Sequence, residues 1–238
     1  KAINLQRKLG GSIQFHAGDI QYASSELLEG SQGDILQKRR NQYLKACRRQ
    51  NVDLESLLQV IESWKDTRIV ILGDTIVDQY AACEAIGMSA EAPVVVVREL
   101  NKRNFIGGAA IVASHIKALG AKCDLISVVG NDKTAQLVKQ ELKNQHIGDS
   151  LVVDSSRPTT FKKRYIVENQ KLFRVSRMEE HSIAFEIEQE IITKLRDLAP
   201  KIKGIVVSDF VYGVVTPRIL DVLHSLAKTY NLKKWHQE

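Results

Sequence analysis

Three carboxylates in this 238-residue chain stand at or shortly after the ends of apolar runs, where side chains can meet a ligand. Asp74 and Asp78 follow RIVILG, and Asp209 follows GIVVS. In open parallel sheets, ligands bind beyond the carboxyl ends of the strands, and a carboxylate there accepts hydrogen bonds from ligand hydroxyls. Asp also caps helices and turns. For Asp74 both interpretations stay open, as they do for Asp132 in the later Gly-Asn-Asp sequence.

A pair of glycines opens a predicted helix between these carboxylates. Gly107-Gly108 precedes a face of small residues, Ala109, Ala110 and Ala113. Glycine lets backbone N–H groups approach a polar ligand at a helix N-terminus. The pair alone is weak evidence for a binding site. It is followed, in a fixed order, by Leu-Gly-Ala, an apolar strand and Gly-Asn-Asp, and that series is a much stronger signal.

Strands and helices that alternate along the chain are predicted to position these residues. Short apolar, β-branched runs are typical of strands buried on both faces, and they occupy 68–74, 123–132 and 204–210. Helical patterns lie between and after them, at 108–119, 133–145, 186–199 and 216–228. This alternation predicts an α/β fold with a mostly parallel sheet and helices on both of its faces.

A second set of predicted strands is more mixed in polarity. These strands occupy 92–100, 159–167 and 171–179. Only Glu168-Asn169-Gln170 joins the last two, which predicts a hairpin. Because no helix separates them, we expect a small antiparallel sheet over the edge of the main sheet.

The chain before Arg68 lacks the strand–helix alternation of the later residues. Residues 1–33 predict a strand and a short helix from an incomplete unit, and 34–64 predict two helices that break at Asn51–Asp53. The first of these helices is basic, through Lys38, Arg39, Arg40, Lys45, Arg48 and Arg49. Such a run is either a nucleic-acid patch or a solvated helix face. We favour the solvated face, because no interleaved aromatic residues accompany the charges, and nucleic acid is therefore not an expected partner.

Composition narrows the class of protein further. The net charge is +6 and 44% of the residues are hydrophobic, which is ordinary for a globular protein. No apolar stretch reaches the ~18 residues that a membrane helix needs, so no membrane partner is expected. Three widely spaced cysteines favour a reducing cytoplasm, and the six histidines show no metal-ligand spacing. We expect no metal site in this chain.

The Gly-Gly helix and the segments around it resemble the PfkB/ribokinase family of carbohydrate kinases. The resemblance covers about 68–232, with RIVILGDTIVDQY, RPTTFKKRY and VVSDFVYGVVT among the matching segments. Within the family, the chain is most similar to the kinase module of ADP-heptose synthase-type bifunctional proteins. The Asp74–Asp78 spacing and the S-x-E-A-P-V sequence at 89–94 carry that similarity. GGSIQFHAGDIQYASSELL is similar to the tail of a nucleotidyltransferase module that precedes the kinase module in some fused relatives.

The resemblance implies three parts: a nucleotidyltransferase-like tail at 1–33, a helical linker at 34–67 and the N-terminal part of a sugar kinase at 68–238. The kinase part would be a ribokinase-like three-layer α/β/α domain with an antiparallel β lid, truncated at its C-terminus. A cytoplasmic protein, a sugar or sugar-phosphate substrate and a homodimer formed through the lid are further implications. In the complete protein, ATP and Mg²⁺ would serve phosphoryl transfer; this chain is expected to bind neither well.

The resemblance also implies a set of substrate-binding residues. Sugar hydroxyls would be held by Asp78, Gly107 and Gly108, and Asp209 is assigned to the same site. Lys162, Arg164 and Arg174, on the predicted lid and edge strands, could meet a sugar phosphate, which Arg binds in a bidentate manner. The alternative for these three cations is an outward-facing position on the strands. The implied substrate-binding residues are Asp78, Gly107, Gly108, Lys162, Arg164, Arg174 and Asp209.

Three departures from the family pattern limit what the resemblance implies. Ile111 stands where the family has an Asn that contacts the sugar, and Tyr212 stands where ADP-heptose-type relatives have a Lys. The Gly-Ala-Gly-Asp motif, which carries the family's general base, does not occur. Ala17-Gly18-Asp19 resembles it only superficially, because it precedes the first kinase strand. Since phosphoryl transfer depends on that motif, we expect no catalytic residue and no turnover in this chain itself.

The last residues and the departures together give two hypotheses. KKWHQE, after Leu232, shows no strand pattern, and we expect an unfinished sheet there. The leading hypothesis is a fragment of an ATP-dependent heptose-phosphate-like kinase of nucleotide-sugar biosynthesis, fused to a nucleotidyltransferase. The alternative is a non-catalytic kinase-like domain that binds a sugar or nucleotide.

Overall fold

A computed structural model describes residues 32–168 and 170–237, which form two compact units that divide between Leu57 and Leu58. Helix α3 (Gln32–Arg49) is followed by α4 (Leu54–Glu62), which crosses that division. The Ser56 N–H donates to Asp53 Oδ1 over 2.7 Å, so Asp53 caps α4 and the predicted break between the helices is confirmed. The predictions for residues 1–31, including Ala17-Gly18-Asp19, lie outside the described residues.

The basic residues of the first unit lie along α3. Arg39, Arg40, Lys45, Arg48 and Arg49 are all exposed, as expected for a helix face in water. Neither α3 nor any other helix in the described ranges is long and apolar enough to cross a membrane.

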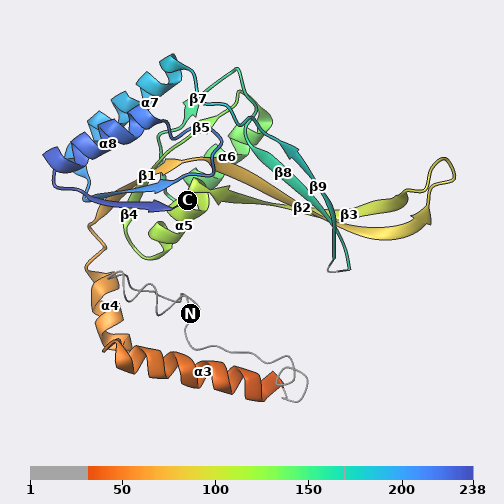
Figure 1. Cartoon of the computed structure of the whole chain (residues 1–238), viewed down its shortest axis with the longest axis horizontal. Coiled ribbons are helices and arrows are strands. Elements are labelled where there is room, and N and C mark those ends of the chain that lie inside the picture. The colour runs from red at the N-terminus through yellow and green to blue at the C-terminus, as the bar shows by residue number, and fades with distance from the viewer. Residues whose placement is uncertain (1–31, 169, 238) are drawn as a thin grey trace, which may run out of the picture. The chain divides into compact units, whose positions relative to one another are not determined.

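The second unit is built around a five-stranded parallel sheet (Figure 1). Its strand order is β11-β10-β1-β4-β6, and every neighbouring pair is parallel. The strands are β1 (Arg68–Gly73), β4 (Lys122–Ile126), β6 (Gly148–Asp149), β10 (Gly204–Ser208) and β11 (Lys233–Gln237). The three buried strands predicted from their apolar runs are therefore confirmed as β1, β4 and β10.

Helices cover both faces of this sheet, which confirms the three-layer prediction. The helices are α5 (Ala109–Ala118), α6 (Lys133–Asn144), α7 (Phe185–Leu198) and α8 (Pro217–Thr229). Successive residues of β1 point to opposite faces: Ile71 packs in the core with α5 and α6, and Leu72 packs in the core with α7 and α8. Thr216 caps α8 ahead of Pro217, as the sequence predicts.

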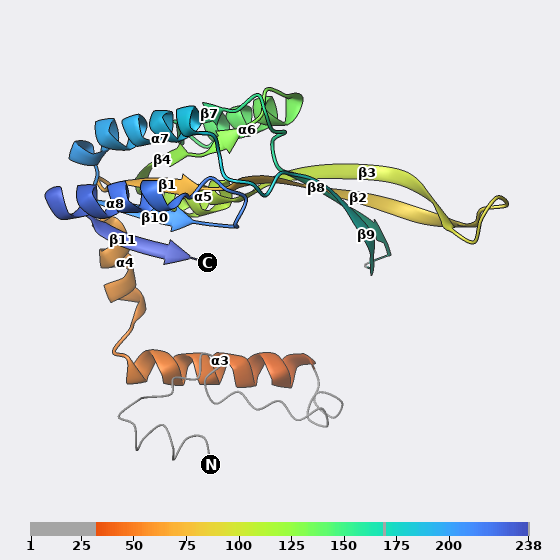
Figure 2. The ribbon, with the colours of Figure 1, turned by 45° about the horizontal axis from the view of Figure 1, so that its top comes forward.

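The C-terminal residues differ from the prediction. Residues 233–237 form β11, which pairs in parallel with β10, so the expectation of no strand there was wrong (Figure 2). The polar sequence misled the prediction because strand formation at a sheet edge is set by backbone pairing with the neighbouring strand and needs no apolar alternation.

A second sheet carries the strands of mixed polarity. Its order is β3-β2-β8-β9, with strands β2 (Thr75–Met88), β3 (Val95–Gly108), β8 (Phe161–Val167) and β9 (Gln170–Arg177). The predicted hairpin is confirmed as β8 and β9, and Glu168 in its turn has a positive φ of 48°. Figures 1 and 2 show β2 and β3 extending beyond the parallel sheet as a long ribbon.

Two features of this second sheet were not predicted. Strand β2 was missed altogether, and β3 runs on as far as Gly108. The sheet is also mixed: β2 and β8 are parallel, and only its outer pairs are antiparallel. Elsewhere a short parallel pair joins β5 (Val128–Val129) to β7 (Val152–Val153), and a 3₁₀ turn covers Ala199–Lys201.

Candidate sugar-binding site

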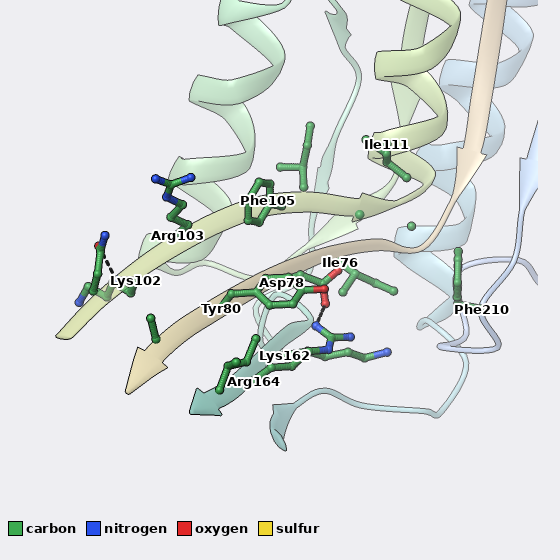
Figure 3. Close-up of a pocket in the computed structure, with 16 residues that line it drawn as sticks. Ile76, Asp78, Tyr80, Lys102, Arg103, Phe105, Ile111, Lys162, Arg164 and Phe210 are labelled. Atoms are coloured by element: carbon green, nitrogen blue, oxygen red, sulfur yellow. Dashed lines mark hydrogen bonds and ion pairs between the residues drawn. The ribbon is translucent and has the colours of Figure 1, made fainter. Parts of the chain in front are cut away.

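A pocket of about 830 Å³ opens over the second sheet (Figure 3). Its walls come from β2, β3 and β8, from the first turn of α5 and from Phe210 in the loop after β10. Five of the seven residues predicted from the sequence line it: Asp78, Gly107, Gly108, Lys162 and Arg164. Residues more than 80 positions apart in the chain thus share one site.

The other two predicted residues lie outside the lining. Arg174 pairs with Arg164 across β8 and β9, so it shares the pocket face of the sheet but lies one strand farther out, where it is exposed. Asp209 turns its Oδ1 to the N–H of Val211, over 2.8 Å, and so stabilises its own loop. In the structure, Arg174 borders the site and Asp209 shapes a loop near it.

An ion pair between neighbouring strands forms the charged part of the pocket. Arg164 on β8 donates through Nη1 to Asp78 Oδ1 on β2 (Figure 3). The guanidinium also lies over the Tyr80 ring, 5.3 Å from its centroid, and that ring meets the Phe105 ring edge-on at 5.7 Å. Arg164 therefore has a fixed orientation, and its remaining N–H groups can bind an anion.

The two glycines are needed for the backbone to pass so close to the Asp78 carboxylate and to the backbone of Asp74. A Cβ on Gly107 would stand 2.7 Å from Asp78 Oδ2. Gly108 has φ +60°, and a Cβ there would stand 2.1 Å from the carbonyl oxygen of Asp74. That same oxygen accepts the N–H of Ala109 over 2.8 Å, at the start of α5. The first N–H groups of a helix have no partner within it, so this end of α5 can donate to a ligand.

Lys162 is a buried cation on the wall of the pocket. It is 9% exposed, and its Nζ donates to Tyr212 Oη over 2.6 Å. The ammonium also lies 4.9 Å from the centroid of the Tyr212 ring. Among the described residues it has no carboxylate within ion-pair distance. A buried ammonium without a counter-ion favours an anionic ligand.

Asp74 connects the end of β1 to the loop after β10. Its Oδ2 accepts the N–H groups of Phe210, over 2.8 Å, and Tyr212, over 3.3 Å. Within the described ranges its Oδ1 is buried without a hydrogen-bond partner, as is Oγ1 of Thr75. Burial raises the pKa of Asp74, against the hydrogen bonds from Phe210 and Tyr212, which lower it. Asp74 thus holds in place the loop that presents Phe210 to the pocket.

Asp132 serves as a helix cap, one of the two roles left open for it. Its Oδ1 accepts the N–H of Ala135 over 2.8 Å at the start of α6, and its Oδ2 accepts the N–H of Thr159 over 2.9 Å. Burial opposes its ionisation, but the hydrogen bonds from Thr159 and Ala135 outweigh burial and lower the pKa of Asp132.

Comparisons with known proteins identify the family. Residues 66–232 match the description "pfkB family carbohydrate kinase". This chain belongs to the pfkB family of carbohydrate kinases. It is 34% identical over 170 residues to "Bifunctional protein HldE" of Campylobacter jejuni, covering 71% of this chain and 35% of that protein. The protein of the same name from Helicobacter hepaticus is 34% identical over 168 residues, covering 69% of this chain and 34% of the relative. The chain thus spans about a third of the length of these relatives.

Solved structures agree on the fold of this pfkB-family chain. Phosphofructokinase-2 of Escherichia coli, in complex with fructose-6-phosphate, superposes with a TM-score of 0.56 at 18% identity, covering 71% of this chain and 54% of that one. A carbohydrate kinase from Agrobacterium tumefaciens gives 0.52 at 14% identity, covering 71% and 53%. The predicted ribokinase-like α/β fold and the predicted family are therefore confirmed.

Several lining residues of this pfkB-family pocket were not found from the sequence. Phe105 and Phe210 are exposed aromatic residues that line it, and Arg103 lies opposite Tyr80 on β3. Their placement depends on strand register and on a loop held by Asp74, neither of which has a sequence signal. Four cations and one carboxylate line the pocket, which makes it electropositive: Lys102, Arg103, Lys162, Arg164 and Asp78.

The described residues offer no preformed metal site. No group of three or more His, Cys, Asp or Glu side chains among them lies close enough together to hold a metal ion.

Proposed function

We propose that this chain supplies the sugar-binding part of a kinase that transfers a phosphoryl group from ATP to a heptose-phosphate-like sugar. The convergence of Asp78, Arg164 and Lys162 on one electropositive pocket carries this proposal. Membership of the pfkB family supports sugar phosphorylation, and the resemblance of the 89–94 sequence to ADP-heptose synthase-type proteins supports a sugar of nucleotide-sugar biosynthesis.

Each polar group has a place in such a complex. The Asp78 carboxylate accepts hydrogen bonds from sugar hydroxyls through the lone pairs that Arg164 leaves free. Arg164 and Lys162 neutralise the phosphate that the sugar already carries, and the planar guanidinium can bind two of its oxygens. The N-terminus of α5 adds backbone N–H donors beside Gly108.

ATP and Mg²⁺ belong to the proposed reaction of the whole protein. ATP supplies the phosphoryl group, and Mg²⁺ neutralises charge on its phosphates. The 238 residues contain no Gly-Ala-Gly-Asp sequence, the motif that carries the general base in the family pattern. The role proposed for this chain is therefore to hold and orient the acceptor sugar.

Calorimetric titration of the chain tests this role. We expect a heptose phosphate or fructose 6-phosphate to bind at least tenfold more tightly than the unphosphorylated sugars and than inorganic phosphate. Arg164→Ala removes the charge that faces the pocket and should weaken sugar-phosphate binding about tenfold or more. Arg177→Ala is the matched control, because Arg177 pairs with Phe161 on the core side of the same two strands. Binding of no sugar and no sugar phosphate would refute the proposal.

A binding-only domain is the second candidate function. Ile111 favours it, because a hydrocarbon side chain lines the pocket at the N-terminus of α5. A turnover assay with ATP on the full-length protein separates the two candidates. Phosphorylation of any sugar phosphate in the panel supports the kinase, and binding without turnover supports the binding-only domain.

We also propose that the second sheet forms a homodimer. Large apolar side chains are exposed along β2, β3 and β9: Ile86, Met88, Val95, Leu100, Leu172, Phe173 and Val175. Exposed apolar surface of this extent on a sheet is typical of an interface. Light scattering on the protein as it elutes from a size-exclusion column should give twice the mass of the chain. Phe173→Lys should lower the measured mass to that of the monomer. A monomer in the unmodified protein at high concentration would contradict this partner.

A further inference from the structure

One wall of the pocket is apolar although its occupant is proposed to be a sugar. Ile111 lies in the first turn of α5, lines the pocket and is 39% exposed. Phe210 is 43% exposed and Phe105 is 52% exposed, and both line the same pocket from other elements. Large apolar side chains that gather in one pocket, instead of scattering over a surface, mark the place of an apolar part of a ligand.

Two of the pocket's cations, Lys162 and Arg164, lie on the other side of β2. Figure 3 shows Ile111 and Phe105 on the side of α5 and β3, and Lys162 and Arg164 on the side of β8. The strand order β3-β2-β8 gives the same separation. Farther along β3, away from α5, Arg103 lies opposite Tyr80 and adds a positive charge to the pocket wall. Ile111 thus lies at the end of the pocket where α5 begins, on the opposite side of β2 from Lys162 and Arg164.

Ile111 limits what can lie against it. A sugar hydroxyl held against this side chain would lose its hydrogen bonds to water and gain none from isoleucine. A carbon without a hydroxyl would instead bury apolar surface on the same wall. The neighbouring aromatic residues do not relieve the conflict, because neither phenylalanine has a polar group.

We propose that Ile111 determines specificity by selecting a sugar phosphate that presents a carbon without a hydroxyl, a deoxy or methyl position, to the Ile111 side chain. This inference rests on the proposed function and narrows its substrate class. The charged and hydroxylated side of the same ligand meets Asp78, Arg164 and Lys162. Ile111 acts here by direct contact with the ligand and has no part in proton or phosphoryl transfer.

Titration with paired ligands tests the inference on the chain as it exists. The probes are glucose 6-phosphate and each of its monodeoxy analogues, measured by calorimetry under identical conditions. We expect one analogue to bind about tenfold or more tightly than glucose 6-phosphate, and Ile111→Asn to remove or reverse that preference. Ile111→Val keeps the apolar wall and should keep the preference.

A second substitution, just after the same helix, serves as the control. Leu119, the C-cap residue that follows α5, is 41% exposed and does not line the pocket, so Leu119→Asn should leave the preference unchanged. If glucose 6-phosphate and its analogues bind but none of the analogues is preferred, or if Ile111→Asn leaves the ratio as it was, the inference is wrong and the proposed function stands. Failure of every sugar phosphate to bind would overturn both.

Discussion

The two sheets of the second unit differ in how far their faces are exposed to water and ligand. The parallel sheet is covered by helices on both faces, and Val70, Ile71 and Leu72 at the centre of β1 are fully buried. The second sheet has one face toward the core, where Val77 and Ala81 are buried, and one face lined with Asp78 and Tyr80. A charged side chain without a partner costs little free energy only on a face that water or a ligand reaches. We therefore expect changes in the parallel sheet to alter stability and changes in the second sheet to alter binding.

The largest loss of stability is expected from a substitution at the centre of the parallel sheet. Leu125 on β4 is fully buried, and Leu125→Ala should lower the free energy of unfolding by about 2–5 kcal/mol through lost burial and a new cavity. Urea denaturation followed by circular dichroism measures it. Sugar-phosphate affinity of the folded variant should stay within about twofold of the original; a large loss of affinity in a still-folded variant would break the separation of roles.

The two adjacent glycines give the sharpest comparison between stability and binding. Gly108→Ala places a Cβ at a position with a positive φ and against the backbone of Asp74. It should lower the free energy of unfolding by on the order of 1–3 kcal/mol. Gly107→Ala meets only the end of the Asp78 side chain, so it should weaken sugar-phosphate binding about tenfold and change stability less. Denaturation and calorimetry on both variants check this, and equal stability losses would contradict it.

Asp74 lies where the two sheets meet, and its effect should depend on pH. Because burial raises its pKa in the folded state, folding favours the protonated form. Its contribution to stability is then greatest below the pKa of the unfolded chain and falls as pH rises toward the folded-state pKa. Asp74→Asn removes this dependence. Relative to that variant, the unmodified protein should lose stability as pH rises from about 4, the ordinary Asp value. Parallel stability curves for the two proteins would show that Asp74 does not titrate in this way.

The smallest effect is expected on the outer ribbon. Lys163 on β8 donates to Glu99 on β3 over 2.6 Å, and this hydrogen bond lowers the pKa of the exposed Glu99 carboxyl. Water and salt screen such a pair, so Glu99→Gln should leave both the urea midpoint and sugar-phosphate affinity unchanged. A clear shift in affinity would mean that the ligand site extends along the ribbon beyond the pocket.

The difference in burial between the two sheets also explains how well each could be predicted from the sequence. Strands β1 and β10 are mainly apolar runs, because both of their faces are buried, and such runs are visible in the sequence. Strand β2 reads TIVDQYAACEAIGM, where small and polar residues interrupt the alternation. Its conformation comes from pairing with β3 and β8, which are distant in the chain.

The site was predictable in part for a related reason. Asp78, Gly107 and Gly108 belong to local motifs, and the pocket contains all three. Phe210 reaches the pocket only because Asp74 binds its backbone, and Phe105 only because of its register with Asp78. Lys162 was predicted as a candidate cation, but its contact with Tyr212 joins segments 50 residues apart and has no local signature.

The contact between Asp78 and Arg164 also has a consequence for folding. The two residues are separated by 86 positions, and β4, α6 and the short β5–β7 pair are formed by the chain between them. Closing so long a loop is slow and depends on the elements inside it. A ligand that binds both residues therefore recognises only chains in which this whole segment has folded. Sugar-phosphate binding, followed in real time during refolding, would report the completion of the fold, and excess ligand would stabilise that state by mass action.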